Sequence, residues 1–290
     1  GEGYVGTVHR GLERVKEDNK TAHQLMKQIF PNMGAGELAT AKMFIYRTVN
    51  KRIGNLEDLY DRAVPFSNGG PGVTNGVAAL KLNLDLMDRS RVQPEYGFTS
   101  IPALGDRLLR SSYLYDGVYA APGVERFAEK SSWDKNDTRE MGNLIALFTI
   151  PTMGNSQKGA LAVGEKVEQV MTTLITNYKA PTFPGEVDIA KALRGYDTYK
   201  ESCAHCHGTY QWMGSRPELK SYPNKLVSAD YIGTDRSRLN AVSDYLVTEF
   251  NKSQLATAAV AARTGGYVAP LLNSLWATAP YLHNGSVPTL

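Results

Sequence analysis

The stretch Cys203-Ala204-His205-Cys206-His207 decides what this chain folds around, because its spacing is Cys-x-x-Cys-His. That spacing is the attachment pattern of c-type haem. Two thiols three positions apart can reach the two vinyl groups on one edge of the porphyrin, and the imidazole that follows comes under the iron. The stretch predicts one covalently attached haem c, bound by Cys203 and Cys206, with His207 as an axial ligand of the iron.

Two other kinds of site use closely spaced cysteines. A zinc site would need His205 and His207 as its remaining ligands, and they are too close together to match the usual zinc spacings. A thioredoxin-like redox pair would need a strand before it and a helix beginning at the cysteines, whereas here a helix is expected to end there. The chain has only 2 cysteines, which excludes a framework of several disulfides. Haem is the favoured interpretation.

The segment before the motif has the features of the first helix of a cytochrome c domain. Asp188 is the expected N-cap of a helix that runs to the cysteines. Gly195 and Tyr199 lie eight and four positions before Cys203, on the same helical face. Cytochrome c domains have a small residue and an aromatic at these positions, where a later helix packs closely. The resemblance therefore extends beyond the five-residue motif.

The sixth coordination position of the iron has several candidates: His283, a methionine, water or a small substrate. Met213 lies only six residues after His207, too close to pass around the porphyrin edge, and His205 lies inside the attachment loop. His283 lies 76 residues after His207 in a loop with proline and glycine, so it can fold back over the far face. The alternative for His283 is a loop histidine that only forms hydrogen bonds.

Apolar periodicity predicts a mainly α fold with long irregular loops. The resemblance around the motif implies that the fold includes one or more cytochrome c-like helical haem domains. A lone histidine such as His9 or His23 in the first helical segment is expected to be a surface or internally bonded residue. Helices are expected within residues 1–60 around a break at Pro31, and in 137–150, 160–177 and 237–250, whereas 64–116, 208–235 and 269–290 are expected to be loops.

A segment with two prolines, residues 179–185, is the best domain boundary, and we place the break near residue 183. It divides an N-terminal helical and loop domain, 1–183, from a haem domain, 184–290. The net charge of +3 is spread along the chain, so no nucleic-acid partner is expected. No stretch approaches the roughly 20 apolar residues of a transmembrane helix. The start at Gly1 fits a processed or partial chain.

The stretch Leu-Trp-Ala-Thr-Ala-Pro-Tyr-Leu-His-Asn-Gly-Ser-Val-Pro-Thr-Leu, residues 275–290, resembles the C-terminal signature of bacterial dihaem cytochrome c peroxidase-like proteins. The resemblance is strongest to the branch that includes the rubber oxygenases. Residues 232–238, Ile-Gly-Thr-Asp-Arg-Ser-Arg, are similar to a segment that the family has between the haem motif and this signature. Shorter similarities to the first haem domain lie at 70–73, 101–104 and 115–117, so the resemblance extends from about Pro65 to the end of the chain.

This resemblance implies two haem domains, one for electron transfer and one where peroxide or dioxygen reacts. The chain departs from that pattern, because residues 1–202 contain no cysteine and no second Cys-x-x-Cys-His is present. The family's distal ligand for the C-terminal haem corresponds to His283, which makes the haem bis-His and six-coordinate. Such a closed haem favours electron transfer over binding of small molecules.

The remaining candidates for haem contacts come from the same segments. Arg236, together with Arg238 and Asp235, is a candidate to anchor the haem propionates or to brace the loop. Trp276 and Tyr281 are expected to be apolar walls of the haem pocket. Trp133 is a candidate neighbour of a first haem, or a core or surface residue.

The sequence therefore predicts a c-type cytochrome that exchanges electrons with a redox partner protein. One alternative is a haem peroxidase or oxygenase, with a small-molecule oxidant or an apolar substrate at a haem bound by the N-terminal half. Another alternative is a cytochrome subunit of a larger redox assembly. A periplasmic or secreted location is expected, because covalent haem assembly takes place on the far side of the cytoplasmic membrane.

Overall fold

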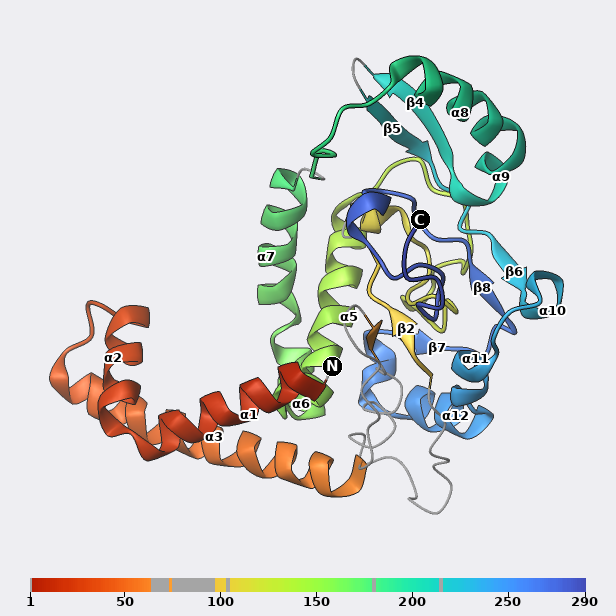
Figure 1. Ribbon diagram of the computed structural model, residues 1–290. Helices are drawn as coiled ribbons and strands as arrows, with labels where there is room; N and C mark the ends of the chain where they lie inside the picture. The colour runs from red at the N-terminus through yellow and green to blue at the C-terminus, as the bar shows by residue number, and fades with distance from the viewer. Residues whose placement is uncertain (1, 64–72, 75–96, 103–104, 179–180, 214–215) are drawn as a thin grey trace.

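The computed structural model describes residues 2–63, 73–74, 97–102, 105–178, 181–213 and 216–290. Within these ranges helices dominate and the strands are short and paired in twos, which confirms the prediction of a mainly α fold (Figure 1). Most of the predicted loop at 64–116 lies outside the described residues. None of the described helices is long and apolar enough to cross a membrane.

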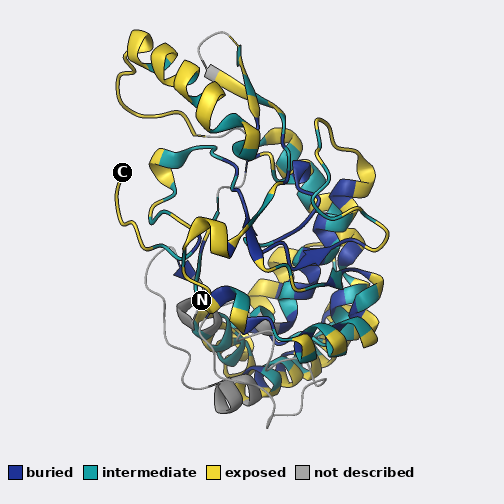
Figure 2. Cartoon of the chain, turned by 90° about the vertical axis from the view of Figure 1, so that its right-hand side faces the viewer, coloured by how far each residue is buried: buried dark blue, intermediate teal, exposed yellow. Residues whose placement is uncertain are grey.

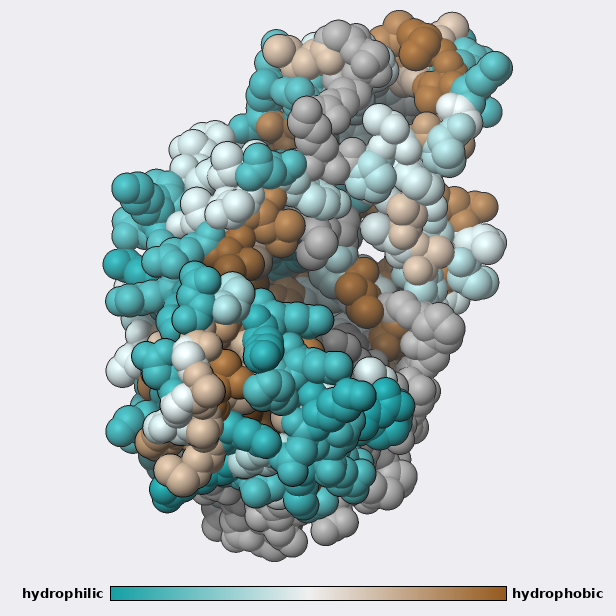
Figure 3. All heavy atoms as spheres, turned by 90° about the vertical axis from the view of Figure 1, so that its left-hand side faces the viewer, coloured by the Kyte–Doolittle hydropathy of each residue, from teal (hydrophilic) through white to brown (hydrophobic). Residues whose placement is uncertain are grey.

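Three helices form the N-terminal part: α1 (Glu2–Glu17), α2 (Asn19–Ile29) and α3 (Ala35–Ala63). They project from the rest of the molecule as an arm (Figure 1). The Asp18 side chain caps α2 by accepting a hydrogen bond from the Lys20 backbone N–H at 2.9 Å. The predicted break at Pro31 separates α2 from α3, whereas the further break between α1 and α2 at Asp18 was not predicted. The face of the molecule on this side is largely hydrophilic (Figure 3).

The helices α5 (Lys135–Met153), α6 (Gln157–Ala162) and α7 (Gly164–Asn177) follow the first loop region. A capping box between Asp134 and Asp137 starts α5, and Gly154 ends it with a φ of 61°. The prediction of one continuous helix over 160–177 is wrong at its start. The helix is interrupted at Val163, whose backbone N–H bonds back to Ala160 three residues before it.

The haem motif lies between α8 (Ile189–Ser202) and the short α9 (Ala204–His207). Residues 208–235 were expected to be loop, but they contain a hairpin of β4 (Thr209–Met213) and β5 (Arg216–Ser221), then β6 (Leu226–Ser228) and α10 (Ala229–Ile232). The strand β4 does alternate, with Tyr210 and Trp212 partly buried between exposed neighbours, so the sequence held a short strand signal that the loop prediction overlooked.

The C-terminal part contains α11 (Ser237–Ala241), α12 (Asp244–Lys252) and the 3-10 turn η3 (Gln254–Thr257). Two antiparallel pairs connect distant parts of the chain: β3 (Tyr119–Ala120) with β7 (Val260–Ala261), and β6 with β8 (Gly266–Val268). A third pair joins β1 (Val73–Thr74) to β2 (Thr99–Ser100). After β8 the described chain is irregular, as expected, apart from the turn η4 (Leu275–Ala277).

The main hydrophobic core is built from both sides of residue 183. Leu144 and Leu147 of α5 share one buried cluster with Leu246 and Phe250 of α12. The ring of Tyr119 lies 5.1 Å from that of Phe250, between centroids. Figure 2 shows the buried residues gathered in this region, whereas α8 is largely exposed. The division of the chain near residue 183 stays a prediction.

Candidate haem site

A single turn of chain holds the two thiols and the first imidazole. The Asp188 side chain caps α8 by accepting from the Lys191 N–H at 2.9 Å, as the sequence predicts. The helix ends at Cys203, whose backbone N–H donates to the Tyr199 carbonyl. The His207 backbone N–H then donates to the Cys203 carbonyl at 3.0 Å, which closes α9 around the motif. Both cysteines are free thiols and partly buried.

The imidazole of His207 is oriented by a backbone carbonyl. Its Nδ1 lies 2.8 Å from the carbonyl oxygen of Pro270, just after β8. Because a carbonyl only accepts, Nδ1 is the protonated nitrogen in this contact, and Nε2 keeps its lone pair for a metal. This is the usual way in which a protein fixes the tautomer and direction of a histidine ligand. His207 therefore fits the role of an iron ligand.

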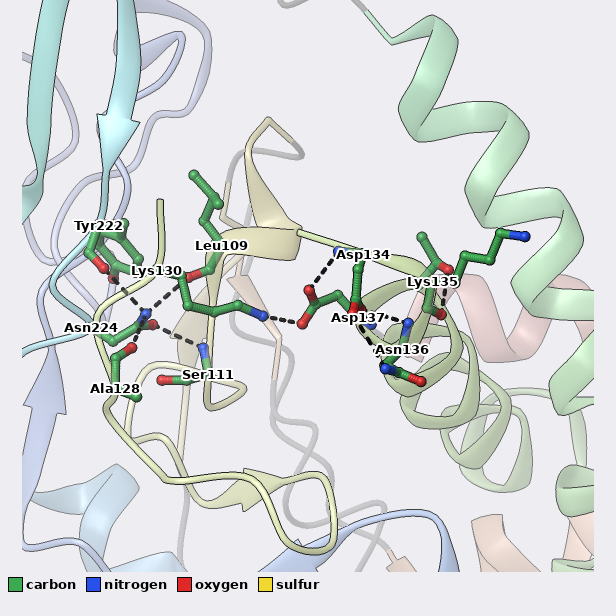
Figure 4. Close-up of polar contacts among 11 residues, drawn as sticks. Leu109, Ser111, Ala128, Lys130, Asp134, Lys135, Asn136, Asp137, Tyr222 and Asn224 are labelled. Atoms are coloured by element: carbon green, nitrogen blue, oxygen red, sulfur yellow. Dashed lines mark hydrogen bonds and ion pairs between the residues drawn. The ribbon is translucent and has the colours of Figure 1, made fainter. Parts of the chain in front are cut away.

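The segment around Pro270 is itself held in place. The Tyr222 hydroxyl donates to the carbonyl of Ala269. The backbone of Tyr222 pairs with that of Lys130 in both directions, and the fully buried Asn224 amide donates to Leu109 and Ala128 carbonyls, both at 2.8 Å. Figure 4 shows how these contacts join the loop before α5 to the chain that follows β5.

His283 is buried, with 8% of its surface exposed. Its ring stacks on Tyr267 of β8, with centroids 3.9 Å apart and planes inclined by 30°. Within the described part of the chain, its Nε2 is buried and has no hydrogen-bond partner. Burial lowers the pKa of His283 below its ordinary value, which favours the neutral imidazole that binds metals. A buried nitrogen without a protein partner fits the donor atom of an iron ligand.

The backbone around His283 is attached to the first half of the chain. The Ser100 N–H donates to the His283 carbonyl at 2.8 Å, and the Ser100 hydroxyl donates to the Leu282 carbonyl at 2.8 Å. Tyr267 and Pro270, the residues that contact the two histidines, lie three positions apart, so at most about 10 Å of extended chain separates them. One short segment therefore supports both candidate ligands.

The two arginines named from the sequence differ in their surroundings. Arg238 and Asp116 form a buried bidentate ion pair, with Nε to Oδ2 at 2.9 Å and Nη2 to Oδ1 at 3.1 Å. Arg236 is exposed and pairs with Asp230. The side chain of Asp235, the residue just before Arg236, accepts a hydrogen bond from Ser237, and its backbone carbonyl accepts one from the Tyr267 hydroxyl. The role of Arg236 as a propionate anchor stays a prediction.

The two aromatic candidates lie in the terminal loop. Trp276 is 41% exposed in η4 and makes an edge contact with Phe183, with ring centroids 6.0 Å apart. The Tyr281 hydroxyl donates to the Leu275 carbonyl at 2.8 Å and so braces the loop. Their roles as walls of the haem pocket stay predictions. Trp133 is an exposed residue just before α5.

Two features of the site differ from the sequence analysis or were absent from it. A Cβ at Gly195 would have nothing within 4 Å apart from its chain neighbours and the backbone of its own helix, so the expected close packing of a later helix there is not found among the described residues. Instead Tyr199 donates to the Gly208 carbonyl at 2.7 Å and its ring meets Tyr210 edge-on. Tyr267, which stacks on His283, belongs to no motif, and no local sequence signal points to it.

A Cys-x-x-Cys-His turn after an exposed helix, in a mainly α chain, defines a cytochrome c-like class of protein. Residues 266–290 match the family described as RoxA-like, cytochrome c-like. The match supports a RoxA-like haem family for this part of the chain, a kind of domain that implies haem c with its iron. This match covers the segment with Tyr267, Pro270 and His283. The dihaem peroxidase-like relationship and a first haem motif stay predictions.

One curated relative has no assigned function. The uncharacterized protein y4iM of Sinorhizobium fredii (strain NBRC 101917 / NGR234) is 26% identical over 225 residues, which cover 59% of this chain and 49% of the relative. The chain therefore spans about half the length of that protein. No solved structure matches the chain.

Proposed function

We propose that this protein is a c-type cytochrome that transfers electrons through one haem c. In this proposal Cys203 and Cys206 attach the haem covalently, and His207 and His283 bind the iron from its two sides. The observation that carries the proposal is the hydrogen bonding of the two imidazole rings. One is turned by a hydrogen bond to the Pro270 carbonyl, and the other keeps a buried Nε2 without a partner.

When bound, haem c supplies one-electron redox chemistry, and the protein supplies its attachment and surroundings. The hydrogen bond from His207 Nδ1 to Pro270 increases the basicity of Nε2 and holds the ring plane. Tyr267 holds His283 by stacking and is itself fixed by its hydroxyl bond to Asp235. Two imidazole ligands leave no position for a small molecule, which supports electron transfer rather than oxygen chemistry.

A redox partner protein and a periplasmic or secreted location belong to the same proposal. The location follows from the place where haem c is attached covalently. Among the described residues no contact favours the alternative of a peroxidase or oxygenase haem in the N-terminal half, and that alternative rests on sequence resemblance. The haem count per chain distinguishes the two, because the alternative requires a haem besides the one at Cys203 and Cys206.

The test of the ligation is the variant His283→Ala in the haem-containing protein. We expect the wild type to show a low-spin ferrous spectrum that carbon monoxide does not change. The variant should become high-spin and bind carbon monoxide, because the sixth position opens. His205→Ala is the matched control, since His205 is exposed and lies inside the motif. A His283→Ala variant with the wild-type spectrum would exclude His283 as the ligand.

The test of the attachment is the intact mass. We expect one haem adduct per chain that survives denaturation, and its loss in Cys203→Ser with Cys206→Ser. Two adducts would contradict the single-haem proposal and favour the enzyme alternative. An unmodified chain after expression with the haem attachment machinery would contradict covalent attachment.

A further inference from the structure

A second group of possible metal ligands lies between the first and third helices. His9 and Glu13 belong to α1, and Glu57 belongs to α3. One nitrogen of His9 and one oxygen of each carboxylate all lie within 4.8 Å of one another. His9 Nδ1 is 3.6 Å from Glu13 Oε2, and His9 Nε2 is 3.8 Å from Glu57 Oε1.

The positions of these residues are those of a two-helix metal site. His9 and Glu13 are four residues apart, so their side chains lie on one face of α1, one turn from each other. Two ligands at this spacing on a helix are the basis of several zinc sites. Glu57 adds a third ligand from α3, which runs alongside α1 (Figure 1). The site therefore needs no loop to bring its ligands together.

The turn of α3 that bears Glu57 is anchored to the body of the protein. Leu56 is fully buried, and the Asn55 amide donates to the Gly154 carbonyl at 2.7 Å. Gly154 lies so close to α3 that a Cβ there would be 2.5 Å from the Arg52 carbonyl oxygen. A ligand on a fixed turn loses little entropy when a metal binds, which favours a defined site.

We propose that His9, Glu13 and Glu57 bind a divalent metal ion of the zinc class. One imidazole with two carboxylates suits Zn²⁺, whereas Ca²⁺ and Mg²⁺ prefer all-oxygen sites. Two carboxylates also balance the charge of the ion. Ligands about 2.1 Å from zinc must be roughly 3–4 Å apart. Because one ion binds one nitrogen of His9, the glutamate that now faces the other nitrogen must rotate towards it to complete the set. The fourth position is left for water, and the ion ties α1 to α3.

The competing explanation is a protonated His9 that bridges the two carboxylates without any metal. A metal-binding measurement separates the two, because only the metal site takes up Zn²⁺ saturably. If His9 bridges the two carboxylates without a metal, Zn²⁺ has no saturable effect at this position. If the three side chains form a metal site, Zn²⁺ binding saturates.

The experiment is equilibrium dialysis of the intact haem-containing protein against Zn²⁺ after treatment with EDTA, with zinc counted by elemental analysis. We expect about one Zn²⁺ per chain. Glu57→Gln should weaken binding roughly tenfold or more, and His9→Ala should weaken it further, because each removes a direct ligand. Zinc should also raise the thermal midpoint of the wild type in far-UV circular dichroism, and not that of Glu57→Gln.

The matched control is His23→Ala on α2, which removes a histidine outside this group and should bind zinc like the wild type. Glu57→Gln preserves the size of the side chain, so its circular dichroism spectrum should match that of the wild type. The zinc binding of this variant therefore tests the proposal even if His9→Ala folds poorly. Equal zinc binding by the wild type and Glu57→Gln would overturn the proposal, and so would the lack of saturable binding. The haem spectra serve as an independent check, since this site is separate from the proposed electron-transfer centre.

Discussion

Replacing Arg238 with methionine should destabilise the protein strongly, because it leaves a carboxylate alone in the core. The side chains of Arg238 and Asp116 are each 2% exposed, and the two hydrogen bonds between them measure 2.9 and 3.1 Å. In the variant the donor that the described residues leave to the Asp116 carboxylate is the Val118 backbone N–H at 3.4 Å, a long contact. Methionine fills part of the space of the guanidinium stem and brings no charge.

The expected cost is about 3–5 kcal/mol in the free energy of unfolding, the usual range when one partner of a buried ion pair is removed. Most of this cost is the unpaired charge of Asp116 rather than the loss of attraction. The double variant Arg238→Met with Asp116→Asn carries no buried charge, so it should lose less than the sum of the two single variants. We expect a coupling of about 1–3 kcal/mol between the two sites.

The assay is urea unfolding of the haem-containing protein, followed by far-UV circular dichroism and by haem absorbance to check that the two transitions coincide. The control is Arg263→Met, whose pair with Asp244 at 3.0 Å has side chains 48% and 85% exposed. An exposed pair of this kind should contribute less than about 1 kcal/mol. The reasoning fails if Arg238→Met costs no more than the control, or if the costs of the two single variants simply add.

Two further predictions concern α5. Burial, and then the nearby charge of Asp137, raise the pKa of Glu140 above 4.5 in the folded protein. Glu140 therefore stabilises the native state below pH 4.5, and this contribution is lost as the pH rises through the pKa of the folded state. Glu140→Gln should therefore raise the urea midpoint at neutral pH, with the gain vanishing below pH 4.5; a gain that is independent of pH would contradict this cause. Gly154→Ala should cost at least about 1 kcal/mol in thermal unfolding, because Gly154 has a φ of 61° and a Cβ would lie 2.5 Å from the Arg52 carbonyl oxygen. An unchanged melting temperature would show that α3 and α5 separate easily at this point.

The parts of the site that depend on short-range spacing could be predicted from the sequence. The turn at Cys203, the cap at Asp188 and the helical arm all follow from neighbouring residues. The Asp116 to Arg238 pair spans 122 positions and could not be predicted, because its two residues meet only through the path of the whole chain. For the same reason the Pro270 carbonyl beside His207 and the Tyr267 ring beside His283 had no local signal.

The hairpin of β4 and β5 was missed for a different physical reason. The period of two is present in β4, where Tyr210 and Trp212 alternate with polar residues, but it spans few residues and its inner face is only partly buried, so the loop prediction overlooked it. The interruption at Val163 was missed because apolar periodicity continues across it from α6 into α7. In both cases the difficulty lies in a small difference in burial between the two faces of the element, and not in an unusual backbone conformation.

The segment from Tyr267 to Pro270 bears on how fast the proposed centre would exchange electrons. His207 and His283 lie 76 residues apart in the chain, yet both are held by contacts to these few residues, which continue from a paired strand. A common support lets the two imidazoles keep their spacing when the charge at the metal changes by one. Small nuclear displacement means a low reorganisation energy, so loosening this segment should slow electron exchange even where the reduction potential is unchanged.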